Sequence, residues 1–208
     1  IKMVLNMLML NLPVEKIGAE MYELLTMANR TTEDVFSLLD NLLKWTKSQI
    51  GNLNVVYQDV DAVEVVDSVI DVFNMVAGLK KITIREEKPE KLPVCTDIDM
   101  LKTIIRNLLS NAIKFSNENS EVLVKMEEQG DTVVVSVKDS GCGIDEEGQQ
   151  KLLHTDTHFS TFGTNNEEGS GLGLLLCQDF AVKIGGKLWF TSKEGEGSTF
   201  YFSIPLKK

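Results

Sequence analysis

The chain has 208 residues, a length that allows one medium-sized domain with an appendage or two small domains. Its hydrophobic content of 43% is ordinary for a globular protein, and its net charge of −10 argues against nucleic acid or anionic membranes as partners, because both are bound through basic surfaces. The three cysteines lie too far apart for a metal site or a disulfide framework, so a reducing, cytoplasmic setting is expected.

The first stretch of the chain is predicted to be helical. Ile1–Leu10 carries methionine and leucine on one face and begins without a cap, so we interpret it as the middle of a helix in a protein that continues upstream. No apolar run reaches the ~18–20 residues of a membrane-spanning helix, so no direct membrane contact is expected. The pattern from Ala19 to Ile50 predicts a long helix that is ended by Gly51.

Apolar residues repeat every seven positions along this long helix. The repeat comprises Met21, Ala28, Val35 and Leu42. Such a seam must be buried against other helices, which predicts a helical hairpin that forms a homodimer through the 19–50 helix as a four-helix bundle. The alternative is a two-helix extension that lies on the surface of its own domain.

After Gly51 the pattern changes to short strands and helices, which places a domain boundary there: residues 1–51 form a helical dimerisation segment and residues 52–208 a second domain. The elements predicted first are a strand at Leu53–Tyr57, a helix capped by Asp61 and ended by Gly78, strands at Ile82–Arg85 and Val94–Cys95, and a central helix capped by Asp97. Those predicted next are strands Glu121–Gln129 and Thr132–Lys138, a helix Glu146–Leu153, a polar segment His154–Glu168, a helix Leu172–Ile184, and a hairpin of Lys187–Thr191 with Thr199–Ile204. Helices on one face of a mainly antiparallel sheet give an α+β two-layer sandwich.

Polar residues interrupt the end of the central helix. Asn107, Asn111 and Lys114 recur at spacings of four and three, so they share one helix face. An asparagine side-chain oxygen suits Mg²⁺, and a lysine neutralises phosphate, which makes Asn111 and Lys114 candidates for those roles. The alternative is a solvated stripe on an ordinary helix.

Three glycine-rich turns follow in order. Asp139–Ile144 comes directly after a strand, where a buried carboxylate would need donors such as an adenine amino group; the alternative is an aspartate that caps its own turn. Gly169–Leu174 opens a helix whose free N–H groups suit phosphate oxygens; the alternative is a flexible loop without a ligand. Gly195–Phe200 is the third turn.

Together these segments resemble the catalytic half of a bacterial sensor histidine kinase of the GHKL ATPase superfamily. Asn107–Ser116 resembles the N box, Asp139–Ile144 the G1 box and Gly169–Leu174 the G2 box. The resemblance implies a Bergerat-type sandwich that binds ATP and Mg²⁺, with His154–Glu168 as the ATP lid. The nucleotide-binding residues that it implies are Asn107, Asn111, Lys114, Phe115, Asp139, Gly141, Gly143, Ile144, Gly169, Gly171, Leu172, Gly173 and Thr199, with Asn111 as the metal ligand and Asp139 on the adenine amino group.

Two positions depart from the family pattern. The family's phosphoacceptor histidine lies early in the first bundle helix, whereas no histidine here precedes His154, so we expect that site upstream of Ile1 and interpret His154 and His158 as solvent-facing loop residues. ATP-hydrolysing relatives such as gyrase carry a glutamate where this chain has Asn107. An amide does not accept a proton at neutral pH, so fast hydrolysis is disfavoured.

The sequence therefore predicts a kinase that moves the γ-phosphoryl of ATP to a histidine and then to an aspartate of a response-regulator receiver domain. The first alternative is a nucleotide-binding scaffold without catalysis, in which ATP sets the conformation of the bundle. The second is an ATPase of the gyrase and chaperone kind, against which Asn107 argues.

Overall fold

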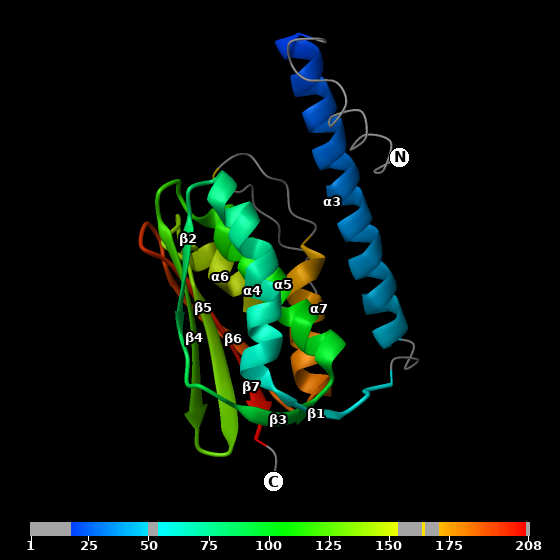
Figure 1. Ribbon diagram of the computed structural model, residues 1–208, viewed down its shortest axis with the longest axis vertical. Coiled ribbons are helices and arrows are strands. Elements are labelled where there is room, and N and C mark those ends of the chain that lie inside the picture. Colours follow the sequence, from blue (N-terminus) through cyan, green and yellow to red (C-terminus); the bar gives the residue numbers. More distant parts are fainter. Residues whose placement is uncertain (1–17, 50–53, 154–163, 165–170, 207–208) are drawn as a thin grey trace. The chain divides into compact units, whose positions relative to one another are not determined.

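The computed structural model describes residues 18–49, 54–153, 164 and 171–206, and the expectations for Ile1–Leu10, Gly169, His154 and His158 lie outside them. The chain divides into two compact units, Ile1–Ile50 and Gly51–Lys208. In the first unit, α3 (Ala19–Gln49) is a single helix, as its heptad pattern predicts (Figure 1). Apolar residues that are exposed on this helix in the described part of the chain include Met21, Leu24, Val35, Leu39 and Leu42.

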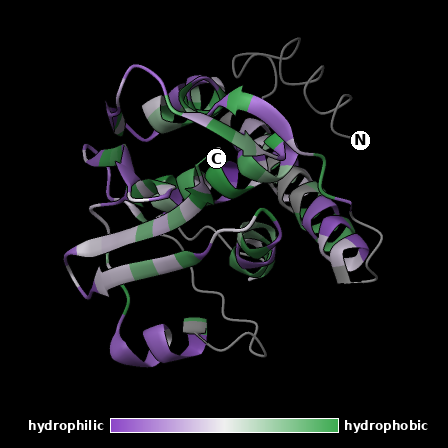
Figure 2. Ribbon diagram, turned by 90° about the horizontal axis from the view of Figure 1, so that it is seen from below, coloured by the Kyte–Doolittle hydropathy of each residue, from purple (hydrophilic) through white to green (hydrophobic). Residues whose placement is uncertain are grey.

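The second unit is built on a five-stranded sheet. Its strands are β2 (Thr83–Glu87), β4 (Glu121–Gln129), β5 (Thr132–Lys138), β6 (Leu188–Lys193) and β7 (Gly197–Pro205), in the order β2-β4-β5-β7-β6. Only the edge pair β2 and β4 is parallel among these strands. In β4, buried residues alternate with more exposed ones, which gives that strand a covered and an uncovered face; Figure 2 shows hydrophobic and hydrophilic residues interspersed along the ribbon.

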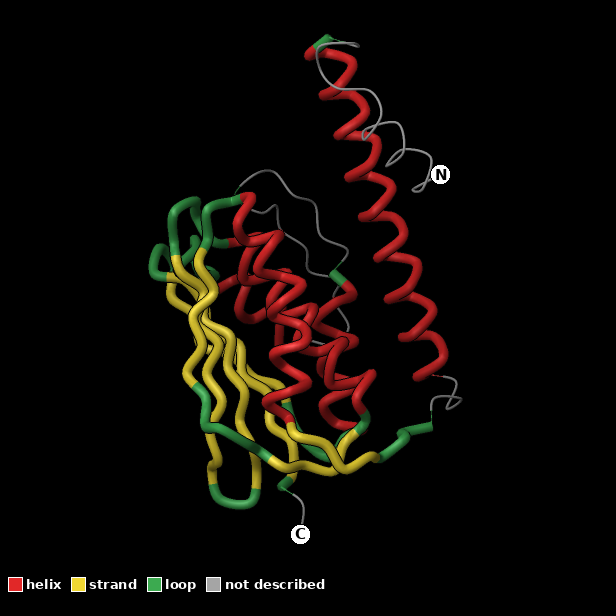
Figure 3. The backbone as a smooth tube through the Cα atoms, in the orientation of Figure 1, coloured by secondary structure: helices red, strands yellow, loops and turns green. Residues whose placement is uncertain are grey.

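Helices form the second layer of this unit. Figure 3 shows α4 (Ala62–Leu79), α5 (Ile98–Phe115) and α7 (Leu172–Lys183) side by side against one face of the sheet. The short helix α6 (Glu146–Leu153) follows β5. The buried residues between the layers include Val66, Ile70, Leu101, Ile104, Leu108, Val122, Val135, Leu176, Phe202 and Ile204. This α+β two-layer sandwich confirms the predicted fold class.

Capping explains where two of the helices begin. The Asp61 carboxylate accepts a hydrogen bond from the Val63 N–H (3.0 Å), and the Asp97 carboxylate accepts from the N–H groups of Asp99 and Met100, both at 3.0 Å. These bonds satisfy donors that a helix start leaves unpaired. Both caps agree with the sequence prediction.

The strand predicted at Leu53–Tyr57 was wrong in its described part, residues 54–57, which form no strand. The strand is β1 (Gln58–Asp61), which pairs with β3 (Pro93–Thr96) in a separate two-stranded antiparallel sheet. The strand is displaced because it forms where the chain pairs with β3, and it runs directly into the α4 cap, since the backbone of Asp61 is itself extended at φ −85° and ψ 116°. Alternating side chains upstream indicated an extended chain but did not identify its partner strand.

Candidate functional site

The polar stripe of α5 lies at the end of a helix whose other face is buried. Leu108, Leu109, Ala112 and Ile113 are buried, whereas Asn107, Asn111 and Lys114 are partly exposed. The helix therefore brings the three predicted residues onto one face.

The two asparagines of this stripe differ in their contacts. The Asn107 amide donates to the Thr103 carbonyl (2.9 Å), and its Oδ1 lies where a Cβ added to Gly173 would come within 2.7 Å. Asn107 therefore packs against α7, and Gly173 makes room for it. The Asn111 amide makes no hydrogen bond within the described part of the chain, so its oxygen is available to a cation.

Asp139 is the buried acid of the site. Its side chain is 4% exposed, and its Oδ1 accepts hydrogen bonds from the N–H groups of Gly141 (3.0 Å) and Ser198 (3.1 Å). Burial raises the pKa of the Asp139 carboxyl, and the backbone donors at Gly141 and Ser198 offset part of that rise. No hydrogen bond among the described residues reaches Oδ2, so this oxygen is open to a donor from a ligand.

Glycines let the backbone segments around Asp139 come into contact. A Cβ on Gly141 would lie 2.1 Å from the Phe115 carbonyl oxygen, and Ser116 pairs with Gly141 in a β-bridge. Gly143 has φ +65°, and a Cβ there would lie 2.0 Å from the Lys193 carbonyl oxygen. Both glycines thus allow two backbone segments of this chain to come into contact. The sequence analysis assigned these glycines to close approach of a ligand and did not predict this packing role.

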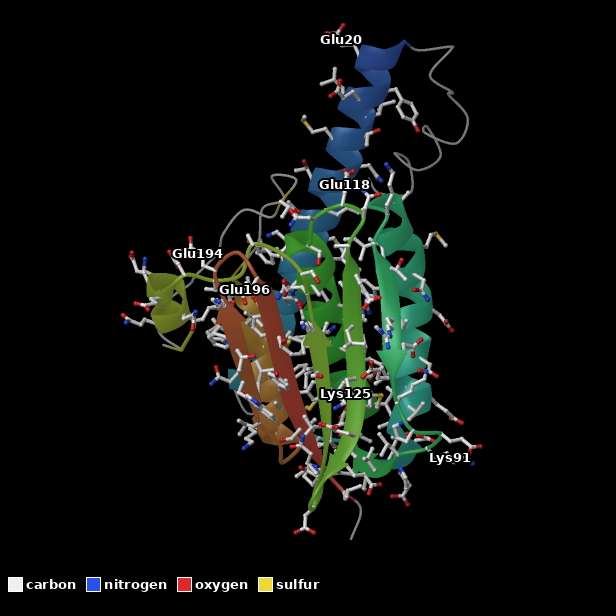
Figure 4. The ribbon with its side chains drawn as sticks, turned by 90° about the vertical axis from the view of Figure 1, so that its left-hand side faces the viewer. Glu20, Lys91, Glu118, Lys125, Glu194 and Glu196 are labelled. Carbon is white, nitrogen blue, oxygen red and sulfur yellow. The ribbon has the colours of Figure 1, made fainter. Side chains whose placement is uncertain are left out.

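The third glycine turn packs on the first. The Gly195 N–H donates to the Cys142 carbonyl (2.7 Å), and a Cβ on Gly197, at φ +98°, would lie 2.3 Å from the Asp139 carbonyl oxygen. The Ile144 N–H donates to Ser192 Oγ (2.9 Å). In Figure 4, Glu118, which follows α5, and Glu194 and Glu196, in the β6–β7 turn, mark this end of the sheet, and Lys91 lies toward the opposite end.

The Thr199 side chain lies on the other face of the sheet from the Asp139 site. The strand register places Thr199 opposite Lys138 and Thr191, on the face of the sheet that carries no helices. Its neighbour Ser198 lies on the helix side, where it is 6% exposed and its Oγ is 2.8 Å from Ser192 Oγ. The residue next to the acid is thus Ser198, which the sequence analysis missed, because sequence alternation alone does not say which face is covered.

The helix α7 starts at a glycine turn without a side-chain cap. Gly171 is the N-cap in the left-handed region, at φ +69°, and no side chain caps the helix there. Leu172 is buried in the first turn and anchors it. The start of a helix carries partial positive charge and suits an anion, which fits the predicted phosphate site.

The other end of the polar stripe is held by residues that sequence reasoning did not single out. The Lys114 ammonium lies 4.8 Å from the centre of the Phe115 ring. The carbonyls of this last α5 turn accept hydrogen bonds from Lys80 and Thr164. Lys80 lies in none of the motifs, and Thr164 lies in the predicted ATP lid without a role assigned to it, so only the folded chain could reveal these contacts.

The assembled site is thus a buried acid beside glycine turns, with an amide and an ammonium on the adjacent helix. Residues 96–208 match the family model described as histidine kinase-, DNA gyrase B- and HSP90-like ATPase. The chain belongs to this family. It contains the ATP-binding catalytic domain of a histidine kinase, and relatives point the same way.

Curated relatives of this histidine kinase domain are sensor kinases. The adaptive-response sensory kinase SasA of Rippkaea orientalis is 30% identical over 171 residues, which cover 81% of this chain and 43% of that protein. The sensor histidine kinase WalK of Bacillus subtilis is 28% identical over 186 residues, which cover 88% of this chain and 30% of that protein. The chain therefore spans less than half the length of these relatives.

Solved structures of histidine kinases have the same fold. The catalytic domain of histidine kinase ThkA is 30% identical with a TM-score of 0.63, and the match covers 73% of this chain and 96% of that one. Histidine kinase AdeS of Acinetobacter baumannii is 21% identical with a TM-score of 0.70, covering 89% of this chain and 86% of that one. None of the helices that the structure describes is long and apolar enough to cross a membrane.

Proposed function

We propose that this domain binds ATP with the adenine amino group on Asp139. The open Oδ2 of that carboxylate is the observation that carries the proposal, because Oδ1 is already paired with two backbone N–H groups and an exocyclic amino group would supply a donor to Oδ2. The Oδ1 bonds to Gly141 and Ser198 hold the carboxylate in one orientation. A histidine kinase solved in complex with AMPPNP shares the fold at a TM-score of 0.71.

The phosphate end of the nucleotide is assigned to the polar stripe and the start of α7. Asn111 presents an amide oxygen without a partner in the described structure, which fits a Mg²⁺ ion that takes few protein ligands. Lys114, one turn further on, carries the charge that neutralises phosphate. The start of α7 after Gly171 adds the positive end of the helix dipole.

The proposed reaction is phosphoryl transfer to histidine. An imidazole nitrogen attacks the γ-phosphorus, the bond from that phosphorus to the β–γ bridging oxygen breaks, and ADP leaves. The chain's own contribution is to hold the nucleotide and neutralise charge, because transfer of this kind depends mainly on positioning and electrostatics. The Asn107 amide cannot act as a general base that takes a proton from an attacking water molecule, which favours phosphoryl transfer over hydrolysis.

The first unit is proposed to make the homodimer on which the histidine is presented. Apolar residues of α3 are exposed along its whole length, from Met21 to Leu43, a pattern typical of a helix that is buried against partners. The phosphoryl group would then pass to an aspartate of a response-regulator receiver domain in the cytoplasm, as in two-component signalling.

Calorimetry with AMPPNP and Mg²⁺ tests the nucleotide site. We expect one nucleotide per chain, and no binding at millimolar ligand would refute the proposal. Kinase activity is tested on the full-length gene product with labelled ATP. Acid-labile, alkali-stable label supports histidine phosphorylation, whereas nucleotide binding without label favours a scaffold.

A further inference from the structure

Lys80 is a buried lysine at the point where α4 ends. It is 8% exposed, and its ammonium donates hydrogen bonds to the carbonyl oxygens of Ile113 (3.0 Å) and Lys114 (2.8 Å) and to Thr164 Oγ1 (2.6 Å). Lysine is seldom buried unless it is paired. Here the partners are the last carbonyls of α5, which a helix end leaves without an intrahelical donor.

A positive charge at this place is favourable for a second reason. The carboxyl end of a helix carries partial negative charge, so an ammonium there stabilises the last turn. Thr164 completes the arrangement: its N–H donates to the Lys114 carbonyl (3.2 Å), and its hydroxyl lies 2.8 Å from the Ser116 carbonyl oxygen. The end of α5 is thus held from two distant parts of the chain.

The segment that Lys80 holds carries two parts of the proposed nucleotide site. Lys114 is the residue assigned to phosphate, and its backbone carbonyl makes the shorter of the two hydrogen bonds from Lys80 to α5. One residue further, the Phe115 carbonyl and Ser116 contact Gly141, whose N–H donates to Asp139. A shift of the last α5 turn would therefore move the phosphate ligand first and the adenine end second.

We propose that Lys80 is a positioning residue for nucleotide binding, which acts by fixing the last turn of α5 and hence the direction of the Lys114 side chain. The inference rests on the proposed function and deepens it. It predicts that loss of the Lys80 ammonium weakens the hold on phosphates more than the hold on adenosine.

The test compares AMPPNP·Mg²⁺ with adenosine on the whole chain by calorimetry. Lys80→Met keeps most of the side-chain volume and removes the charge, Lys80→Arg keeps the charge, and the exposed Lys91→Met is the control. We expect Lys80→Met to weaken AMPPNP about tenfold and adenosine less than threefold, Lys80→Arg to recover part of the loss, and Lys91→Met to match the wild type.

A purely structural role for Lys80 would lower the melting temperature and leave the ratio of AMPPNP to adenosine affinity unchanged, and that result overturns the inference. A double-mutant cycle with Lys114→Ala adds a second criterion. If Lys80 acts through Lys114, Lys80→Met has little further effect on AMPPNP affinity in that background, whereas full additivity overturns the inference.

Thr164→Val covers the case in which Lys80→Met fails to fold. It removes only one hydroxyl partner, so we expect a change of about two- to threefold in the same affinity ratio, and no change overturns the inference. If the wild-type chain binds AMPPNP and the variants leave the ratio of AMPPNP to adenosine affinity unchanged, only the role of Lys80 is refuted. Wild-type chain that binds no nucleotide refutes both proposals.

Discussion

Asp139→Asn is the sharpest test of the site, because the two side chains have nearly the same shape and differ in charge. An asparagine oxygen still accepts from the N–H groups of Gly141 and Ser198, so the turn is kept. The other atom becomes an NH₂ donor that faces the adenine amino group, also a donor. Losing a hydrogen bond to a charged acceptor costs about 1.5–3 kcal/mol, or roughly 10- to 150-fold in affinity for AMPPNP.

The same substitution has the opposite effect on the empty protein. Burial raises the pKa of Asp139 above its usual 3.8, so between these two values the folded chain binds more protons than the unfolded chain. Stability therefore falls as pH rises through that window, and the penalty persists at neutral pH. Asparagine has no charge to bury, so we expect Asp139→Asn to melt at the same temperature as the wild type or higher at pH 7, with the difference shrinking as pH falls toward about 4.

Calorimetry with AMPPNP·Mg²⁺ and thermal unfolding at several pH values measure the two effects. The exposed Asp71→Asn on α4 is the matched control and should change neither. An Asp139→Asn protein that binds AMPPNP as tightly as the wild type would refute the assignment of the adenine amino group. One that is clearly less stable without nucleotide at neutral pH would refute the account of the buried charge.

Three other substitutions or probes test the packing around the site. Gly141→Ala should lower the free energy of unfolding, measured in urea, by about 3 kcal/mol, because its Cβ would lie 2.1 Å from a backbone oxygen. Gly195→Ala is the control: its Cβ would have nothing within 4 Å, so only its φ of +79° should cost about 1 kcal/mol. Equal losses would contradict the proposed contact. Ser198→Val should destabilise the fold by roughly 1–3 kcal/mol and weaken AMPPNP binding. Thr199→Val, on the opposite face of the sheet, should change the free energy of unfolding by no more than about 0.5 kcal/mol and bind AMPPNP like the wild type. The reverse order would mean that the strand register is wrong. Burial raises the pKa of the Cys177 thiol, so a thiol reagent should not modify Cys177 at about pH 8 until denaturant is added. Labelling is measured by mass spectrometry, and rapid labelling of the native protein would contradict the burial of Cys177.

Local signals explain which parts of the fold could be predicted. The whole of α5, with its cap at Asp97 and its polar stripe, follows from the sequence because capping and a 3.6-residue period act within a few turns. The β4–β5 hairpin follows from alternating valines and a Gly130–Asp131 turn. Asp139 follows in turn, as the residue directly after β5 and before a glycine turn.

Features that depend on contacts between distant residues could not be predicted. The choice between Ser198 and Thr199 depends on which face of β7 the helices cover, and alternation in sequence is the same for either answer. The pairing of β1 with β3 joins segments separated by a whole helix. In the sequence, nothing distinguishes Lys80 from other lysines at helix ends. Its contacts depend on the fold, which places the end of α5 within hydrogen-bond distance of its ammonium.

Asn107 connects the chemistry of the site with its packing. Its amide donates to the Thr103 carbonyl, and its oxygen faces the space that Gly173 leaves open, so both ends of the side chain are engaged within the α5–α7 contact. The position that would serve hydrolysis in an ATPase therefore lies in the packing between α5, which carries Asn111 and Lys114, and the start of α7. If the proposed function holds, this contact would align the two proposed phosphate-binding elements with each other, which transfer to an external imidazole would require.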